Sequence, residues 1–225
     1  MQKFYVVGTP IGNLEDVTFR AIAVLSSVDL ILCEDTRVTK KLLARYNIQT
    51  STLSYHARST LAKIDHIISL IKEGKTLSLV SDAGTPSISD PGSLLVSKIR
   101  EALPEIAILA VPGPSALTAA LSVAGVPSSD FLFLGFLPHK KGRETLFKEI
   151  AKSERTVVFY ESPHRLLKSL ESLGGTLLLT RKVTVVKEIT KVFEEVIAGS
   201  IFEVLEFFTK NQDKIRGEFV VIVSP

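Results

Sequence analysis

Residues 75–92 read KTLSLVSDAGTPSISDPG, a short apolar run followed by twelve residues that hold two glycines, two prolines and two aspartates. The apolar run predicts a strand, and the glycines and prolines after it predict a loop. In open α/β sheets, ligands bind beyond the carboxyl ends of the strands. The loop at 81–92 is therefore a candidate phosphate-binding loop, acid/base site or metal site, or it is only a turn.

Composition limits the class of protein. The chain has 225 residues, of which 45% are hydrophobic and 23% charged, which suits one large domain or two of roughly 100 residues each. Its net charge of +3 permits a nucleic-acid partner without arguing for one, and its single cysteine, Cys33, excludes an internal disulfide. No apolar run approaches the roughly 18 residues of a membrane span, and the N-terminus lacks a signal-peptide pattern. We expect a soluble, cytoplasmic protein without a membrane partner.

The first half alternates strand-like and helix-like segments. Its strand candidates are residues 3–7, 29–34, 52–56, 76–80 and 106–113, and its helix candidates are 18–27, 36–46, 59–74 and about 93–102. Strands that are apolar throughout are typical of a parallel sheet covered by helices on both faces. The first half is therefore predicted to be an α/β domain with a mainly parallel sheet.

The second half begins after a candidate linker at 125–130. Its strand candidates are 131–136, 156–160, 176–180, 183–188, 193–199 and 218–223, and helices are expected near 142–152, 163–173 and 201–210. Several of these strands follow one another with only turns between them, which predicts a mixed or antiparallel sheet. We expect two α/β domains, at 1–126 and 127–225.

Four strand ends carry glycine, proline and small polar residues: 6–16 (VVGTPIGNLED), 33–37 (CEDTR), 81–92 and 110–116 (AVPGPSA). A Walker loop requires a terminal Gly-Lys-Ser/Thr, and none of the four contains lysine. Prolines remove the N–H donors that bind phosphates, and Asp82 and Asp90 would repel a phosphate. The four histidines show no metal-ligand spacing, so we predict no metal. S-adenosylmethionine is compatible with such loops, because its sulfonium is cationic and its adenosine carries no phosphate.

Eight motifs, in order over nearly the whole chain, resemble those of the bacterial 16S rRNA (cytidine-2′-O)-methyltransferases, which have the tetrapyrrole methylase (class III) fold. They are GTPIGNLED, CEDTRVTKKLL, SDAGTPSISDPG, VPGPSALTAAL, FLGFLP, ESPHR, KEITK and RGEFVVIV. The resemblance implies a homodimer that binds S-adenosylmethionine in a cleft between the two domains. It implies that the substrate is a cytidine in the decoding region of 16S rRNA, either as free rRNA or in the small ribosomal subunit.

The resemblance also implies residue roles. The cofactor-binding residues it predicts are Pro10, Ile11, Asp82, Ala83, Gly84, Thr85, Ile88, Ser115, Ala116, Phe159 and Tyr160. Candidate catalytic residues, which would orient or deprotonate the ribose hydroxyl, are Asp35, Glu34 and Glu188. Candidate contacts to the RNA are Arg37, Lys41, His56, Arg58, His164, Arg165 and Lys187.

Plainer interpretations of these residues stay open. Asp35 and Thr36 could simply cap a helix, His164 could be a solvated side chain at a helix start, and Lys187 and Glu188 could form a structural ion pair. The first loop, GTPIGN, lacks the second glycine and the aspartate typical of tetrapyrrole methylases, which favours the RNA substrate. Methylation of a tetrapyrrole and a non-catalytic RNA-binding role are the alternatives.

Overall fold

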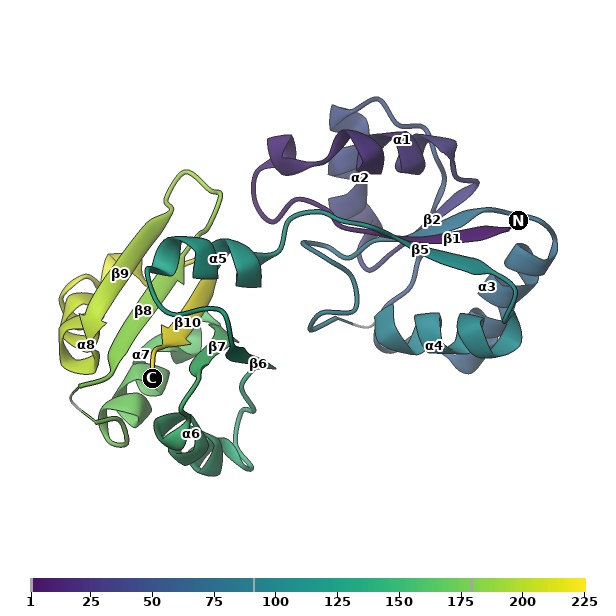
Figure 1. The fold of residues 1–225 in the computed structure, drawn as a ribbon. Coiled ribbons are helices and arrows are strands. Elements are labelled where there is room, and N and C mark those ends of the chain that lie inside the picture. Colours follow the sequence, from purple (N-terminus) through teal and green to yellow (C-terminus); the bar gives the residue numbers. More distant parts are fainter. Residues whose placement is uncertain (1, 91, 179) are drawn as a thin grey trace. The chain divides into compact units, whose positions relative to one another are not determined.

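The computed structural model describes residues 2–90, 92–178 and 180–225, and the chain divides into two compact units, Met1–Ser115 and Ala116–Pro225. The division precedes the boundary that we expected after residue 126. The cause is α5 (Ala116–Ala124), a helix absent from our sequence-based elements, which packs against strands of the second unit. Each unit has its own sheet and core (Figure 1).

The sheet of the first unit contains β1 (Lys3–Val7), β2 (Leu30–Cys33), β3 (Thr52–Ser54), β4 (Leu77–Leu79) and β5 (Ala107–Val111). The strand order is β3-β2-β4-β1-β5, and every neighbouring pair is parallel. The predicted parallel sheet is confirmed. Because all five strands run the same way, the loops that follow them leave from one edge of the sheet.

Helices cover both faces of this sheet, as Figure 1 shows for the first unit. On one face lie α1 (Phe19–Ser27) and α2 (Thr36–Arg45), whose Leu25 and Leu43 pack with Val7 of β1. On the other lie α3 (Leu61–Lys72) and α4 (Gly92–Ala102), whose Ile67 and Ile99 pack with other residues of the sheet. A short 3₁₀ helix spans Leu14–Asp16. This is the two-sided arrangement that the apolar strands predicted.

The sheet of the second unit contains β6 (Phe131–Phe136), β7 (Thr156–Glu161), β8 (Lys182–Lys187), β9 (Glu195–Ser200) and β10 (Phe219–Val223). The order is β6-β7-β10-β8-β9, with β6 and β7 parallel and the remaining pairs antiparallel. The predicted mixed sheet is confirmed. Helices α6 (Arg143–Lys152), α7 (Pro163–Gly174) and α8 (Ile201–Lys210) contribute to one core on this sheet, and a 3₁₀ turn at Gln212–Lys214 follows α8.

The strand expected at 176–180 is wrong for the described residues of that stretch, because residues 176–178 form a turn after α7 and Thr180 is also in a turn. The backbone N–H groups of Thr176 and Leu177 both donate to the carbonyl of Leu173. These bonds satisfy the carbonyl of Leu173 in the last turn of α7, and Leu177 is buried in the core. The described residues 176–178 therefore complete the C-terminal end of α7 and form no strand.

Within the described ranges, we find no helix with both the length and the apolar character needed to cross a membrane.

Candidate active site

The carboxyl edge of the first sheet is held together by backbone hydrogen bonds between loops. Thr9 and Gly84 exchange two such bonds, from Thr9 N to Gly84 O at 2.9 Å and from Gly84 N to Thr9 O at 3.1 Å. Gly8 N donates to Val111 O at 3.0 Å. Three of the four motif-bearing strand ends are thus joined, those after β1, β4 and β5.

Glycine is required where two of these loops touch. A Cβ atom at Gly113 would lie 2.8 Å from the carbonyl oxygen of Gly8, and one at Gly8 would lie 2.9 Å from Cα of Gly113. Gly84 has φ +80° and lies against Ile11, whose Cγ2 would be 3.4 Å from an added Cβ. Gly8 and Gly113 were not among our predicted site residues, although both lie in quoted motifs.

Small polar side chains strengthen the same edge. The Thr9 hydroxyl donates to Ser81 O at 3.2 Å, the Ser81 hydroxyl to Ala83 O at 3.1 Å, and the Thr85 hydroxyl to Pro114 O at 3.3 Å. Of the predicted cofactor residues in this unit, Pro10, Ile11 and Gly84 are buried, Thr85 and Ser115 are half-buried, and Asp82, Ala83 and Ile88 are exposed. Apart from the exposed Asp82, these residues present backbone and neutral side chains.

The two aspartates of the 81–92 loop accept hydrogen bonds from backbone N–H groups, Asp90 within its own loop and Asp82 from the loop after β2. Asp90 Oδ1 accepts hydrogen bonds from the backbone N–H groups of Ser87 and Gly92, and Asp82 Oδ1 accepts one from Asp35 N at 2.9 Å. Ser87 and Ser89 have φ of +76° and +65°, a conformation that non-glycine residues rarely adopt. Among the described residues, no group of three or more His, Cys, Asp or Glu is arranged to bind a metal.

Glu34 and Asp35 follow β2 and differ in their electrostatics. Asp35 caps α2 by accepting from Arg37 N at 2.8 Å, and its carboxylate also binds the Arg37 guanidinium, with a shortest contact of 2.6 Å. The hydrogen bonds from Arg37 lower the pKa of Asp35 to about 2. Glu34 shows the opposite shift, since burial raises its pKa and the nearby Asp82 and Asp90 raise it further.

Glu34 lines a small pocket with Tyr55, Ser81 and Asp90. A base must accept a proton near neutral pH, which favours a raised carboxyl pKa. Glu34 therefore suits proton transfer better than Asp35.

The remaining candidates of the first unit are exposed. Arg37 is paired with Asp35, and Lys41 lies on the outer face of α2. After β3, His56 Nδ1 accepts a hydrogen bond from Arg58 N at 3.2 Å. Their contact with RNA stays a prediction.

Three motifs of the second unit meet at one end of its sheet. Phe219, from RGEFV, pairs in register with Glu161, from ESPHR, and with Lys187, from KEITK. Lys187 is 4% exposed, and none of the hydrogen bonds or ion pairs between described residues involves its ammonium. Its proposed contact with RNA is untested.

Glu188, the third catalytic candidate, belongs to a small ion-pair cluster. Its Oε1 accepts from Lys191 Nζ at 2.8 Å and from Glu218 N at 2.9 Å, and Lys191 also binds the Glu218 carboxylate at 2.7 Å. Burial raises the pKa of Glu188, but the hydrogen bonds from Lys191 and Glu218 outweigh burial and lower it. Gly217 makes room for this carboxylate, since an added Cβ would lie 2.1 Å from it. The geometry favours the ion-pair interpretation.

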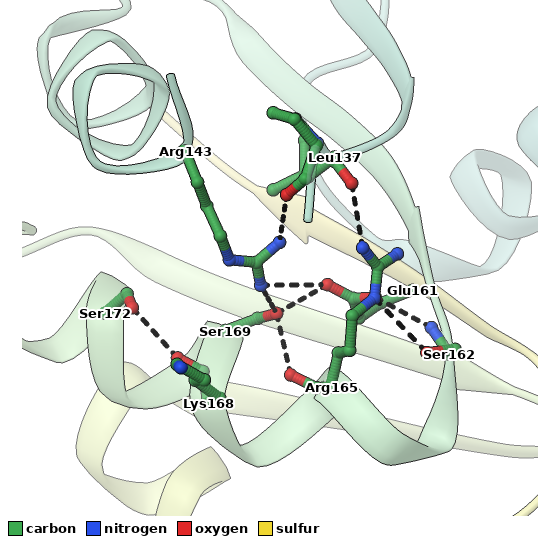
Figure 2. A network of polar contacts seen from close by, with 9 residues as sticks. Leu137, Arg143, Glu161, Ser162, Arg165, Lys168, Ser169 and Ser172 are labelled. Atoms are coloured by element: carbon green, nitrogen blue, oxygen red, sulfur yellow. Dashed lines mark hydrogen bonds and ion pairs between the residues drawn. The ribbon is translucent and has the colours of Figure 1, made fainter. Parts of the chain in front are cut away.

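A second charged network lies beside it, around the fully buried carboxylate of Glu161 (Figure 2). Arg165 Nε binds Glu161 Oε1 at 2.8 Å, and Arg143 Nη2 binds Oε2 at 3.3 Å. The Ser169 hydroxyl donates to Glu161 and accepts from Arg143 at 2.6 Å. Arg165, predicted to contact RNA, is therefore committed to a buried network. No feature of the sequence indicated a role for Glu161 or Ser169.

The remaining predicted residues differ in how far their side chains are exposed. His164 is exposed in the first turn of α7. Phe159 is fully buried in the core, so its side chain offers no surface to a ligand. Tyr160 makes edge-to-face contacts with Phe133 and Phe136, and burial raises its pKa. Ala116 begins α5, immediately after the end of the first unit.

Comparison with known proteins places this geometry in a family. Residues 3–205 match the family Tetrapyrrole (Corrin/Porphyrin) Methylases. The chain is 47% identical to Ribosomal RNA small subunit methyltransferase I of Thermotoga maritima, over 100% of this chain and 99% of that protein. It is 44% identical to the protein of the same name from Vibrio cholerae, over 97% of this chain and 76% of that protein.

The fold is shared with solved structures of lower identity. A uroporphyrin-III-C-methyltransferase from Thermus thermophilus superposes with a TM-score of 0.69 at 19% identity, covering 100% of this chain and 94% of that one. The cobalt precorrin-4 methyltransferase CbiF gives 0.68 at 17% identity, covering 99% and 94%. The resemblance seen in the motifs is confirmed. The chain belongs to the tetrapyrrole methylase family, groups with its ribosomal RNA small subunit methyltransferase I members, and is a methyltransferase.

Proposed function

We propose that this enzyme transfers a methyl group from S-adenosylmethionine to the ribose 2′-hydroxyl of a cytidine in the decoding region of 16S rRNA. The observation that carries the proposal is the full-length similarity to proteins named Ribosomal RNA small subunit methyltransferase I, at 42–47% identity. The motif resemblance supplies the nucleotide and the position. The substrate is 16S rRNA, free or within the small subunit.

The carboxyl edge of the first sheet supports the proposal of S-adenosylmethionine as the cofactor. Its loops approach one another by backbone at Gly8, Gly113 and Gly84, where a Cβ would fill the space. The loop residues 8–13, 81–90 and 110–116 contain no lysine or arginine of their own, and the Arg20 guanidinium that reaches this edge is bound to the carbonyl of Ala110. Pro10, Ile11, Gly84 and Thr85 are the residues we propose to hold S-adenosylmethionine.

When bound, S-adenosylmethionine supplies an electrophilic methyl group on its sulfonium. A ribose hydroxyl is a weak nucleophile, so this chain must align it and can accept its proton. We assign the proton to a carboxylate oxygen of Glu34, whose pKa burial raises. Asp35 and Glu188 have lowered pKa values and are committed to Arg37 and Lys191, so we assign them structural roles.

A transfer assay tests the function. The enzyme is incubated with methyl-labelled S-adenosylmethionine and either naked 16S rRNA or assembled small subunits, and the digested RNA is analysed for 2′-O-methylcytidine. We expect label in that nucleoside. Label in another nucleoside would contradict the proposed site, and label only in an added porphyrinoid would favour the tetrapyrrole alternative.

The assignment of Glu34 has its own test. Glu34→Gln should lower the rate of transfer by about 100-fold or more, the range for loss of a general base. Asp35→Asn, which changes the adjacent carboxylate equally, should have a much smaller effect. Binding of S-adenosylhomocysteine, measured by calorimetry, should stay unchanged in both. A Glu34→Gln enzyme with the wild-type rate would show that alignment alone drives the reaction.

We also propose that the enzyme is a homodimer, as the motif resemblance implies. Light scattering of the purified chain should give twice the mass of 24.6 kDa. The mass of a monomer at micromolar concentration would contradict this.

A further inference from the structure

The six residues between β6 and α6, Leu137 to Gly142, form a basic loop that the catalytic scheme does not use. We call Leu137–Gly142 the basic loop. His139, Lys140 and Lys141 are exposed, whereas Leu137 is buried at its start. Among the described residues, no ion pair involves Lys140 or Lys141. The acidic residue nearest to the loop in the sequence is the exposed Glu144, in the first turn of α6.

The buried network around Glu161 binds the start of this loop directly (Figure 2). Arg165 Nη1 donates to the carbonyl of Leu137 at 2.9 Å, and Arg143 Nη1 donates to the carbonyl of Pro138 at 3.1 Å. Two successive carbonyl groups are thus bound by two guanidiniums that share one carboxylate. The planar fork of arginine allows each to bind the carboxylate and a carbonyl together.

The end of the basic loop is fixed as well. Gly142 has φ +82°, and the Arg143 backbone N–H donates to Lys140 O at 3.3 Å. Arg143 is also the first residue of α6, so its side chain ties the loop's end to its start. Because the loop is held at both ends, its backbone has little conformational entropy left to lose on binding.

The charge balance points to an anionic partner. Two guanidiniums share one buried carboxylate, which leaves a positive excess beneath the exposed Lys140 and Lys141. His164 and Lys168 are exposed on α7, the same helix that supplies Arg165 and Ser169. Lysine binds phosphates as a point charge without reading sequence.

We propose that the basic loop binds backbone phosphates of the RNA substrate, with Arg143, Arg165 and Glu161 as its positioning residues. This inference rests on the proposed function, because it takes rRNA as the partner. It assigns the exposed lysines to RNA contact and the buried arginines to holding the loop. Arg165 then acts on RNA through the loop and not by direct contact.

The salt dependence of RNA binding tests the contact. For Lys140→Gln/Lys141→Gln, we expect weaker binding to transcribed 16S rRNA by about tenfold. The slope of log K against log salt should fall by about 1.5, since each phosphate contact contributes roughly 0.7–0.9. Lys148→Gln/Lys152→Gln removes the same charge from exposed positions of α6 and should leave the slope nearly unchanged. Equal slopes for the two double variants would overturn the contact.

The positioning role has a separate test. Arg143→Met keeps both lysines but removes the bond to Pro138 O, so KM for RNA should rise with kcat nearly unchanged. The salt slope should also fall, and Arg143→Lys should recover it only in part. A wild-type slope and KM in folded Arg143→Met would overturn this role. The lysine double variant changes no buried group, so it answers the question of contact even where Arg143→Met is unstable.

The outcomes separate the two proposals. An enzyme that binds S-adenosylhomocysteine but no form of 16S rRNA would overturn both. An enzyme that methylates 16S rRNA, with the same salt slope in the wild type and in Lys140→Gln/Lys141→Gln, would overturn only the role of the basic loop.

Discussion

The carboxyl edge of the first sheet is shaped by backbone, whereas the motif-bearing end of the second sheet is shaped by charged side chains. In the first unit, Gly8, Gly113 and Gly84 allow loops to touch, and Thr9 pairs with Gly84 through main-chain bonds. In the second, Glu161 binds two guanidiniums and Glu188 one ammonium, and each also accepts a hydrogen bond from a backbone N–H group.

The difference suits the two ligands that we propose. A cofactor without phosphates needs shape and close backbone approach, and glycine permits that approach. A polyanionic RNA needs positive charge at fixed positions, and buried ion pairs fix the residues that carry it. The two regions should therefore respond differently to substitution.

The largest expected loss of stability comes from Glu161. Glu161→Gln leaves the buried Arg143 and the half-buried Arg165 without a counter-charge, so the free energy of unfolding should fall by about 3–5 kcal/mol. Glu101→Gln removes an equal charge from an exposed pair with Lys98, so the free energy of unfolding should hardly change. Urea unfolding of both variants measures the difference, and similar losses would show that burial does not distinguish the two pairs.

The next largest loss of stability is expected at the carboxyl edge of the first sheet, where the loops meet through backbone atoms. Gly113→Ala places a Cβ against Gly8, where the obstacle is backbone that cannot rotate away, so we expect a loss of about 1–3 kcal/mol. Binding of S-adenosylhomocysteine should weaken in parallel, because the loops after β1 and β5 must separate. Gly175→Ala is the control, since an added Cβ there would meet its nearest atoms at 3.7 Å and φ is −79°. Normal binding by Gly113→Ala would remove this edge from the cofactor site.

A smaller effect is expected where a side chain is the obstacle. Gly217→Ala places a Cβ 2.1 Å from the Glu188 carboxyl group, but that group can rotate away at the cost of its bonds to Lys191 and Glu218. We expect a loss of about 1 kcal/mol, mainly from the positive φ of +84°. In Glu188→Ala the same glycine substitution should cost slightly less, which urea unfolding of the double variant measures. A much smaller cost in the Glu188→Ala background would show that the clash with Glu188 is not relieved by its rotation.

Whether a feature of the fold or the site could be predicted from the sequence depends on how far apart in the chain its contacting residues lie. The parallel and mixed sheets followed from apolar runs and their spacing, and the turns at Asp82 and Asp90 from glycine and proline around them. The Glu161 network did not, because Arg143 and Ser169 lie 26 positions apart and meet only after folding. No local pattern marks such partners.

Two errors have local causes. Residues 176–180 were predicted as a strand because TLLLT is a short apolar run, which periodicity alone cannot distinguish from a helix end. The residues of α5 were assigned to no helix or strand, although ALTAALSVA is rich in the helix-formers alanine and leucine. In both stretches tertiary packing decided the outcome.

The smallest expected effect concerns Asp35, a charged residue that follows β2 at the carboxyl edge of the first sheet. Arg37→Gln should raise the pKa of Asp35 from about 2 part of the way toward its ordinary value of 3.8, since the side-chain hydrogen bonds from Arg37 are lost while the backbone ones remain. Any stability from this pair is present above pH 3.8 and lost as the pH falls through about 2, because folding depresses the pKa. NMR titration of the carboxyl carbon should find Asp35 still ionised at pH 3 in the wild type and more protonated at that pH in the variant. Because the pair is exposed, stability at neutral pH should hardly change. A large loss there would mean that Asp35 and Arg37 hold the edge together, and the contrast between the two regions would then be weaker than the geometry indicates.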